Sequence, residues 1–249
     1  IIHRSRHAEL IKGEFESQRE LHKYLPGNVA VPVGYGTLAS DPSSSFFLTA
    51  FLNLCEEVPG PAQVAEVLKK LHGTSVSPNG RFGFHIPTFN GVVPLVNEWC
   101  DTWEEYFARQ LRSDIEWEHS IRGPDPEFDT TADEFFEKVI PGSCVHSRRE
   151  KKHRTDAVGL AMMREPRYHF TGEHVSKYLE AMPPSEPVED FDDRNALYAM
   201  RDNIINAGLH DHRAFLRDKV KEEMRRLIAK HPLGIDGFKK VDNMATFEV

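Results

Sequence analysis

The sequence predicts an α+β fold, with a small sheet near the N-terminus and a mostly helical remainder. The first observation is a pair of segments rich in β-branched and aromatic residues, at 29–37 and 45–52. The second is a series of segments with apolar residues at helical spacing, which recur after residue 100. A length of 249 residues is enough for one large domain or for two lobes.

Three elements are expected in the first part of the chain. Residues 9–25 place apolar residues among charges in the manner of a helix. The segments 29–37 and 45–52 are predicted strands, and the cluster Ser-Asp-Pro-Ser-Ser at 40–44 is typical of a turn. We therefore expect the two strands to pair antiparallel.

A further helix is expected over 61–72, with Gly73 as its C-cap. The densest aromatic region of the chain follows, at 82–112. Its first part contains several glycines and prolines, which predicts a loop with fixed bends. The spacing then becomes helical, because Asp101 or Thr102 can cap a helix that begins there.

The rest of the chain is expected to form a helical layer. Five helices are expected, at 101–121, 131–140, 171–182, 189–208 and 212–230. Apolar residues recur on one face of the first, fourth and fifth of these segments, and Thr171 can cap the third. The acids at the start of the fourth segment, in Asp192-Asp193-Arg194, favour a helix N-terminus because they face the positive end of the helix dipole.

Composition narrows the class of protein. The net charge of -8 argues against a general nucleic-acid-binding protein, which is usually basic. No apolar run is long enough to span a membrane, so no membrane partner is expected. The three cysteines, Cys55, Cys100 and Cys144, show no metal or redox spacing. A reducing compartment, and hence a cytoplasmic location, is therefore expected, and the oligomeric state stays open.

The aromatic region also resembles a known family. The residues that carry the resemblance are Phe82-Gly83-Phe84-His85, Gly91, Pro94, Asn97-Glu98-Trp99, Asp101, Trp103 and Phe107. Together they are similar to the signature of the fructosamine/ketosamine-3-kinases (protein-ribulosamine 3-kinases), relatives of the aminoglycoside phosphotransferases and protein kinases. The resemblance implies a protein-kinase-like two-lobe fold. The lobes would be a truncated N-lobe at 1–55, with a hinge at about 51–57, and a helical C-lobe at 56–249.

The resemblance also implies an activity. It would be the ATP-dependent, magnesium-assisted phosphorylation of the 3-hydroxyl of a ketosamine on a glycated lysine, a step of protein deglycation. Five residues would then lie on the substrate side: His85, Asn97, Glu98, Trp99 and Asp101. Packing of an aromatic loop explains the same residues, so both interpretations stay open at this stage.

On the nucleotide side, the resemblance assigns Glu14, Phe51 and Asn53. Glu14 matches a glutamate that pairs with a phosphate-binding lysine, which is expected upstream of Ile1. A carboxylate stabilised by the helix dipole is the alternative for Glu14. Phe51 and Asn53 fall in the segment that resembles the hinge, where a plain connection between lobes is the alternative.

The strongest departure from the family follows Cys144-Val145-His146. The family continues here as V-H-G-D-L-x-x-G-N, in which the Asp orients the sugar hydroxyl and the Asn holds magnesium. This chain has Val145-His146 and then a basic run, so the Gly, Asp and Asn are absent over 147–155. His146 is the remnant of the motif, and no catalytic residue or metal ligand is assigned.

Two functions of different class follow from this departure. The first is a ketosamine kinase whose catalysis is impaired, because phosphoryl transfer depends on positioning and metal-assisted charge neutralisation. The second is a non-catalytic, pseudokinase-like binding protein or a decayed paralogue. Whether the chain prefers ribulosamine or fructosamine, and whether it still binds ATP and magnesium, stays open at this stage.

Overall fold

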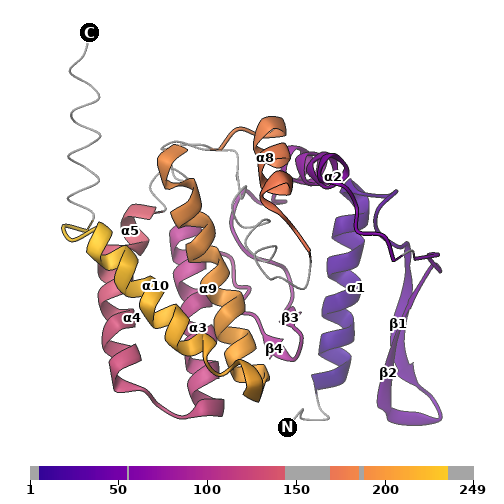
Figure 1. Ribbon diagram of the computed structural model, residues 1–249. Coiled ribbons are helices and arrows are strands. Elements are labelled where there is room, and N and C mark those ends of the chain that lie inside the picture. Colours follow the sequence, from indigo (N-terminus) through magenta and orange to yellow (C-terminus); the bar gives the residue numbers. More distant parts are fainter. Residues whose placement is uncertain (1–5, 55, 144–168, 185–187, 235–249) are drawn as a thin grey trace. The chain divides into compact units, whose positions relative to one another are not determined.

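The computed structural model describes residues 6–54, 56–143, 169–184 and 188–234. Two compact units divide the chain, and Figure 1 labels their elements. The first unit comprises Ile1–Trp99 and Met163–Pro183, and the second comprises Cys100–Met162 and Pro184–Val249. Small antiparallel sheets and longer helices make up the described residues, which confirms the α+β class. The predicted lobe boundary near residue 55 stays a prediction.

The main sheet of the first unit is a two-stranded antiparallel hairpin of β1 (Pro32–Leu38) and β2 (Asp41–Thr49). The predicted pairing is confirmed, but the turn is shorter than predicted because residues 41–44 extend β2. The Asp41 carboxylate accepts a hydrogen bond from the Ser43 amide at 3.0 Å and another from its hydroxyl at 2.6 Å. This local pairing lets polar, turn-forming residues continue a strand.

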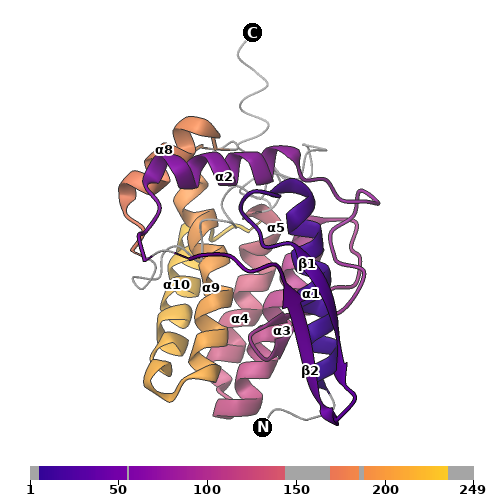
Figure 2. The same ribbon diagram turned by 90° about the vertical axis from the view of Figure 1, so that its right-hand side faces the viewer.

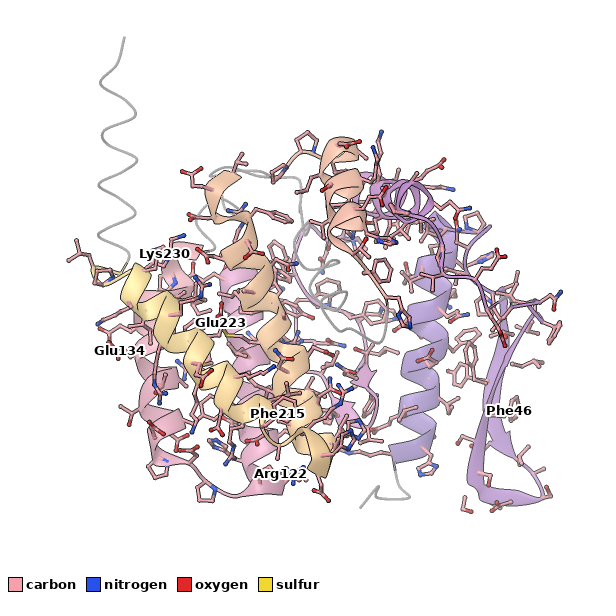
Figure 3. The ribbon with its side chains drawn as sticks, viewed as in Figure 1. Phe46, Arg122, Glu134, Phe215, Glu223 and Lys230 are labelled. Atoms are coloured by element: carbon pink, nitrogen blue, oxygen red, sulfur yellow. The ribbon has the colours of Figure 1, made fainter. Side chains whose placement is uncertain are left out.

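Helix α1 (His7–Tyr24) packs on one face of this hairpin, as Figures 1 and 2 show. The Phe15 ring centroid lies 4.9 Å from that of Tyr35 and 6.1 Å from that of Phe47. Phe46, labelled in Figure 3, lies on β2 and is 41% exposed. The helix therefore covers the apolar residues of the hairpin only in part.

The first unit also contains α2 (Pro61–Thr74) and α8 (Gly172–Ala181), which pack against each other although they are distant in sequence. The buried Tyr178 hydroxyl lies 2.9 Å from Nδ1 of His72. A buried phenol usually needs such a partner, so this bond ties the two helices together at a defined register.

The end of α2 corrects one prediction. Gly73 is not the C-cap, because the helix continues through Thr74 and Ser75 is its C-cap. The Thr74 hydroxyl donates to the carbonyl of Lys70 at 2.6 Å, and this bond supports the last turn.

The second unit is helical, and every predicted helical segment that falls in it is present. Its helices are α3 (Trp103–Arg122), α4 (Pro126–Lys138), α5 (Ile140–Ser143), α9 (Phe191–Leu209) and α10 (Leu216–Lys230), with short 3-10 turns at Val188–Asp190 and Asp211–Arg213. Helix α4 begins earlier than predicted because Oδ1 of Asp125 accepts from the amides of Glu127 and Phe128, both at 3.1 Å. Asp125 followed by proline is a helix start signal.

Helices α3, α4, α9 and α10 share one apolar core, and Figures 1 and 2 show them side by side. Its buried residues include Phe107, Leu111, Phe128, Phe135, Leu197, Met200, Ile204, Met224 and Leu227. The contact of α3 with α9 is close, since a Cβ at Gly208 would overlap the ring of Trp117. The helical spacing of Phe107 and Leu111 therefore marked a core face, as predicted.

Two buried ion pairs also hold this bundle. The Glu118 carboxylate, 1% exposed, accepts a hydrogen bond from Nε of Arg217 at 2.8 Å and another from Nη2 at 2.6 Å. The Asp114 carboxylate, equally buried, accepts a hydrogen bond from Nε of Arg201 at 2.6 Å. Burial raises the pKa of Asp114, although the Arg201 charge opposes this. Of the helices that the structure describes, none has the length and apolar character needed to cross a lipid bilayer.

Candidate functional site

The first part of the aromatic region forms a folded loop in the first unit, at residues 82–99. Two short strands, β3 (Phe89–Asn90) and β4 (Val93–Pro94), pair antiparallel within it. Gly83 has φ +151°, and a Cβ there would lie 2.8 Å from the carbonyl oxygen of Asn97. The amide of Phe84 donates to that same oxygen at 3.0 Å. Glycine is therefore required where the two arms of the loop meet.

Asn97, a predicted substrate-side residue, lies inside this loop. It is 7% exposed, and its amide nitrogen donates to the carbonyl of Ile86 at 3.0 Å and to the hydroxyl of Thr88 at 2.7 Å. These bonds join the arm that precedes β3 to the arm that follows β4. The side chain thus has a structural role in shaping the loop, and any contact with a substrate stays a prediction.

Helix α1 supports the loop from one side. A Cβ on Gly13 would lie 2.8 Å from the carbonyl oxygen of Pro87, so the helix backbone approaches the loop backbone directly. One turn further on, Glu16 is 8% exposed, and its Oε2 lies 3.3 Å from Nε2 of His85. The guanidinium of Arg19 contacts the same carboxylate oxygen. The ring of His85 also lies against that of Phe84, with centroids 4.5 Å apart.

The remaining predicted substrate-side residues lie in different settings. Glu98 is exposed and Trp99 is half-buried, with the Trp99 carbonyl accepting from Nη2 of Arg81 at 3.0 Å. Asp101 is exposed and belongs to the second unit, next to Thr102, whose hydroxyl caps α3 by accepting from the Glu105 amide at 3.1 Å. Thr102, not Asp101, is thus the N-cap. The structure brings His85 and Asn97 into one loop.

The residues predicted on the nucleotide side are all at the surface. Glu14 is exposed on α1, and Phe51 and Asn53 are exposed in the segment that follows β2. Phe51 is 91% exposed. Their role in binding a nucleotide stays a prediction. His146, the remnant of the family motif, lies outside the described residues.

The sequence did not point to Glu16 and Arg19. Both lie on the face of α1 that begins at Gly13, since residues three apart are neighbours on a helix surface. A glycine inside a helix costs stability relative to alanine, so it often marks a close contact. That glycine was the available signal for the face of α1 that meets the loop.

Within the ranges 6–54, 56–143, 169–184 and 188–234, no group of three or more His, Cys, Asp or Glu side chains is placed to hold a metal ion.

Comparison with known proteins identifies the family of this chain. Two crystal structures provisionally assigned as fructosamine-3-kinases share its fold. The one from Thermobifida fusca has a TM-score of 0.67 at 15% identity, over 88% of this chain and 80% of that one. The one from Haemophilus somnus has a TM-score of 0.63 at 14% identity, over 90% and 81%. No curated protein matches. The fructosamine kinase family model matches residues 2–140, more than half of the sequence, and the chain therefore belongs to the fructosamine kinase family.

Proposed function

We propose that this chain recognises a ketosamine, the sugar adduct of a lysine amine, and that it transfers phosphate poorly or not at all. Membership of a kinase family supports a glycated substrate and, in general, the use of ATP. The substrate-side stretch is retained, whereas the residues after His146 depart from the catalytic motif. The observation that carries the proposal is this contrast within one chain.

The loop at 82–99 offers groups that suit such a ligand. A ketosamine carries several hydroxyls and a protonated amine. His85 can exchange hydrogen bonds with a hydroxyl, and the exposed Glu98 carboxylate can pair with a cationic amine. The half-buried Trp99 ring offers a face for a cation or for the sugar. The bonds of Asn97 and the close contact at Gly83 hold the loop in one shape, which lowers the entropy lost on binding.

ATP and magnesium do not find a complete set of partners among the described residues. Magnesium in kinases is held by carboxylate and amide side chains together with the phosphates. The motif that supplies an Asp and an Asn in this family is interrupted at 147–155. Glu14, which would pair with a phosphate-binding lysine, is exposed on α1.

Isothermal titration with two glycated ligands tests the proposal. Fructosyl-lysine and ribulosyl-lysine, each blocked at the α-amine, would be titrated into the full chain, with the same blocked lysine as the matched control. We expect at least one adduct to bind and the unmodified lysine not to bind. Equal binding of lysine and its adducts, or no binding of either adduct, would contradict recognition of a ketosamine.

A thermal-shift titration with ATP distinguishes the impaired kinase from a protein that has lost the nucleotide altogether. A ligand that binds only the native state raises the melting temperature by mass action. A rise that does not depend on magnesium favours a pseudokinase-like protein with a surviving adenine site. A rise that requires magnesium would contradict the proposed loss of the metal site.

A further inference from the structure

The contact between Glu16 and His85 has an unusual distribution of exposure. The side chain of Glu16 is 11% exposed, whereas that of His85 is 44% exposed. A carboxylate is thus buried beneath an imidazole that faces solvent in part. Arg19, on the next turn of α1, is 49% exposed and contacts the same oxygen of Glu16. Burying a carboxylate costs free energy unless partners compensate it, so this group needs both of its partners.

The partner of Nε2 determines the tautomer of the neutral His85 ring. A carboxylate can only accept a hydrogen bond, so Nε2 of the ring, 3.3 Å from Oε2 of Glu16, must carry the proton. In the neutral ring, Nδ1 is then the nitrogen with the free lone pair. Within the part of the chain that the structure describes, no hydrogen bond engages this Nδ1. The ring therefore has one nitrogen fixed from below and one available to accept.

The approach of α1 to the loop explains why this pair can form. Because Gly13 has no side chain, α1 lies directly against the backbone at Pro87 and Thr88. Glu16 then lies beneath His85, which is two residues earlier than Pro87. The ring of Phe84 also lies against the imidazole, with the two centroids 4.5 Å apart. The orientation of His85 is thus set by a helix, by the Phe84 ring and by the hydrogen bond to the Glu16 carboxylate, all within the first unit.

We infer that Glu16 is a positioning residue of the substrate site, which holds His85 as the Nε2–H tautomer so that Nδ1 accepts a hydrogen bond from a ligand hydroxyl or protonated amine. This inference rests on the proposed recognition of a ketosamine. It assigns a role on α1 to Glu16, which differs from that of the exposed Glu14. A side chain that served only to attach the loop would not need to select a tautomer.

Nitrogen NMR of histidine-labelled protein tests the tautomer without any ligand. The chain has 13 histidines, and the signals that disappear in His85→Gln identify those of His85. We expect a protonated Nε2 and an unprotonated Nδ1 in the wild type. Glu16→Gln should mix the two tautomers, because the amide can either donate or accept. Glu9→Gln, on the exposed face of α1, is the matched control and should leave the His85 signals unchanged.

Titration of the same variants with blocked fructosyl-lysine tests the role in binding. Loss of one hydrogen bond should weaken binding by about 5- to 10-fold in Glu16→Gln, and Glu16→Asp should recover part of this loss. The double variant with His85→Gln should bind no more weakly than His85→Gln alone, since the two residues act as a unit. The Nδ1 signal of the wild type should also move when the ligand binds.

Two results would overturn the inference, and they differ from failure of the proposed function. A protonated Nδ1 in the free wild type, or full binding by a Glu16→Gln variant that melts cooperatively, would exclude the positioning role. If Glu16→Gln does not melt cooperatively, Glu16→Asp and the wild-type spectrum decide the same question. If the spectra are as expected but no adduct binds the wild type, the proposed function is wrong, and the role of Glu16 in binding is excluded with it.

Discussion

The loop at 82–99 and the helical bundle of the second unit are stabilised in different ways. The bundle buries large apolar side chains from four helices in one core. The loop depends on two glycines that permit close backbone contact, on the hydrogen bonds of Asn97 and on the pair of Glu16 with His85. Apolar burial is tolerant of shape, whereas hydrogen bonds and close contacts are specific to particular atoms.

This difference suggests which region carries specificity. A core can keep its stability through many apolar exchanges, but a loop shaped by single atoms changes when one of them is replaced. The loop also carries most of the residues of the family resemblance, and its exposed groups are the ones proposed to meet a ligand. The bundle is thus expected to determine stability, and the loop to determine recognition.

The largest expected effect breaks the bundle. Phe135 is fully buried, so Phe135→Ala should lower the free energy of unfolding by about 3–5 kcal/mol, through lost burial and the cavity left behind. Urea unfolding followed by circular dichroism measures this change. Phe215→Ala is the matched control, because Phe215, labelled in Figure 3, is 54% exposed. Similar losses for the two variants would contradict the assignment of the core.

A pair of glycine variants tests the contact of α1 with the loop. Alanine normally stabilises a helix relative to glycine, and Gly73→Ala should do so by about 0.5–1 kcal/mol because a Cβ there meets open space. Gly13→Ala should instead lower the free energy of unfolding by about 1–3 kcal/mol, because its Cβ would overlap the Pro87 carbonyl. The same unfolding experiment measures both. Stabilisation by both substitutions would show that α1 does not lie against the loop.

Loss of the Asn97 hydrogen bonds is expected to have a smaller effect on stability. Asn97→Ala leaves the half-buried carbonyl of Ile86 without its donor and should cost about 1–2 kcal/mol. Asn28→Ala, at an exposed position before β1, is the control and should change stability by less than about 0.5 kcal/mol. If ketosamine binding also depends on this loop, Asn97→Ala should weaken that binding, as measured by calorimetry. Unchanged stability and unchanged affinity would show that the hydrogen bonds of Asn97 are dispensable.

The smallest effect concerns pH and two carboxylates of the bundle. Burial alone would raise the pKa of Asp193, but hydrogen bonds from Lys230 and Arg226 outweigh burial and hold the pKa below its ordinary value. Figure 3 labels Lys230 at the end of α10. This carboxylate therefore stabilises the fold above the ordinary pKa, and the contribution is lost as the pH falls through the folded value. Between neutral pH and pH 3, the free energy of unfolding of Asp193→Asn should therefore fall by about 1 kcal/mol less than that of the wild type. The effect is small because the ion pairs are partly exposed.

Asp114 is expected to contribute to the pH dependence of stability with the opposite sign, so it serves as the comparison for Asp193. Because burial raises its pKa, the folded state takes up a proton more readily than the unfolded state, and its contribution to stability rises as the pH falls. Asp114→Asn should therefore change the slope of stability against pH in the direction opposite to Asp193→Asn. Unfolding curves at a series of pH values measure both slopes. Slopes that change in the same direction would contradict the assigned environments.

The sequence was a good guide where one periodic pattern determines the structure. Phe107 and Leu111 predicted a core face, because helical spacing places them on one side whatever the neighbouring elements are. Residues 41–44 were predicted as a turn, and they extend a strand because Asp41 and Ser43 satisfy each other. The start of α4 was missed although Asp125 carried a capping signal.

The site was harder to predict because its contacts join segments that are distant in sequence. Resemblance to a family pointed to His85 and Asn97, but only the fold places Glu16 beneath His85. That contact depends on Gly13 meeting Pro87, and a glycine inside a helix indicates a close contact without specifying its partner. Sequence similarity also pointed to Glu14, which is exposed on the same helix. Local propensity thus predicted elements, and tertiary contact decided which carboxylate meets the loop.

The central claim is that this member of the fructosamine kinase family recognises a ketosamine without transferring phosphate to it. Phosphorus NMR of the full chain with ATP, magnesium and blocked fructosyl-lysine or ribulosyl-lysine tests the claim directly. The account predicts that the spectrum retains the signals of ATP alone, under conditions in which calorimetry shows the adduct to be bound. A phosphomonoester signal that grows only when the adduct is present would contradict it and would establish a working kinase.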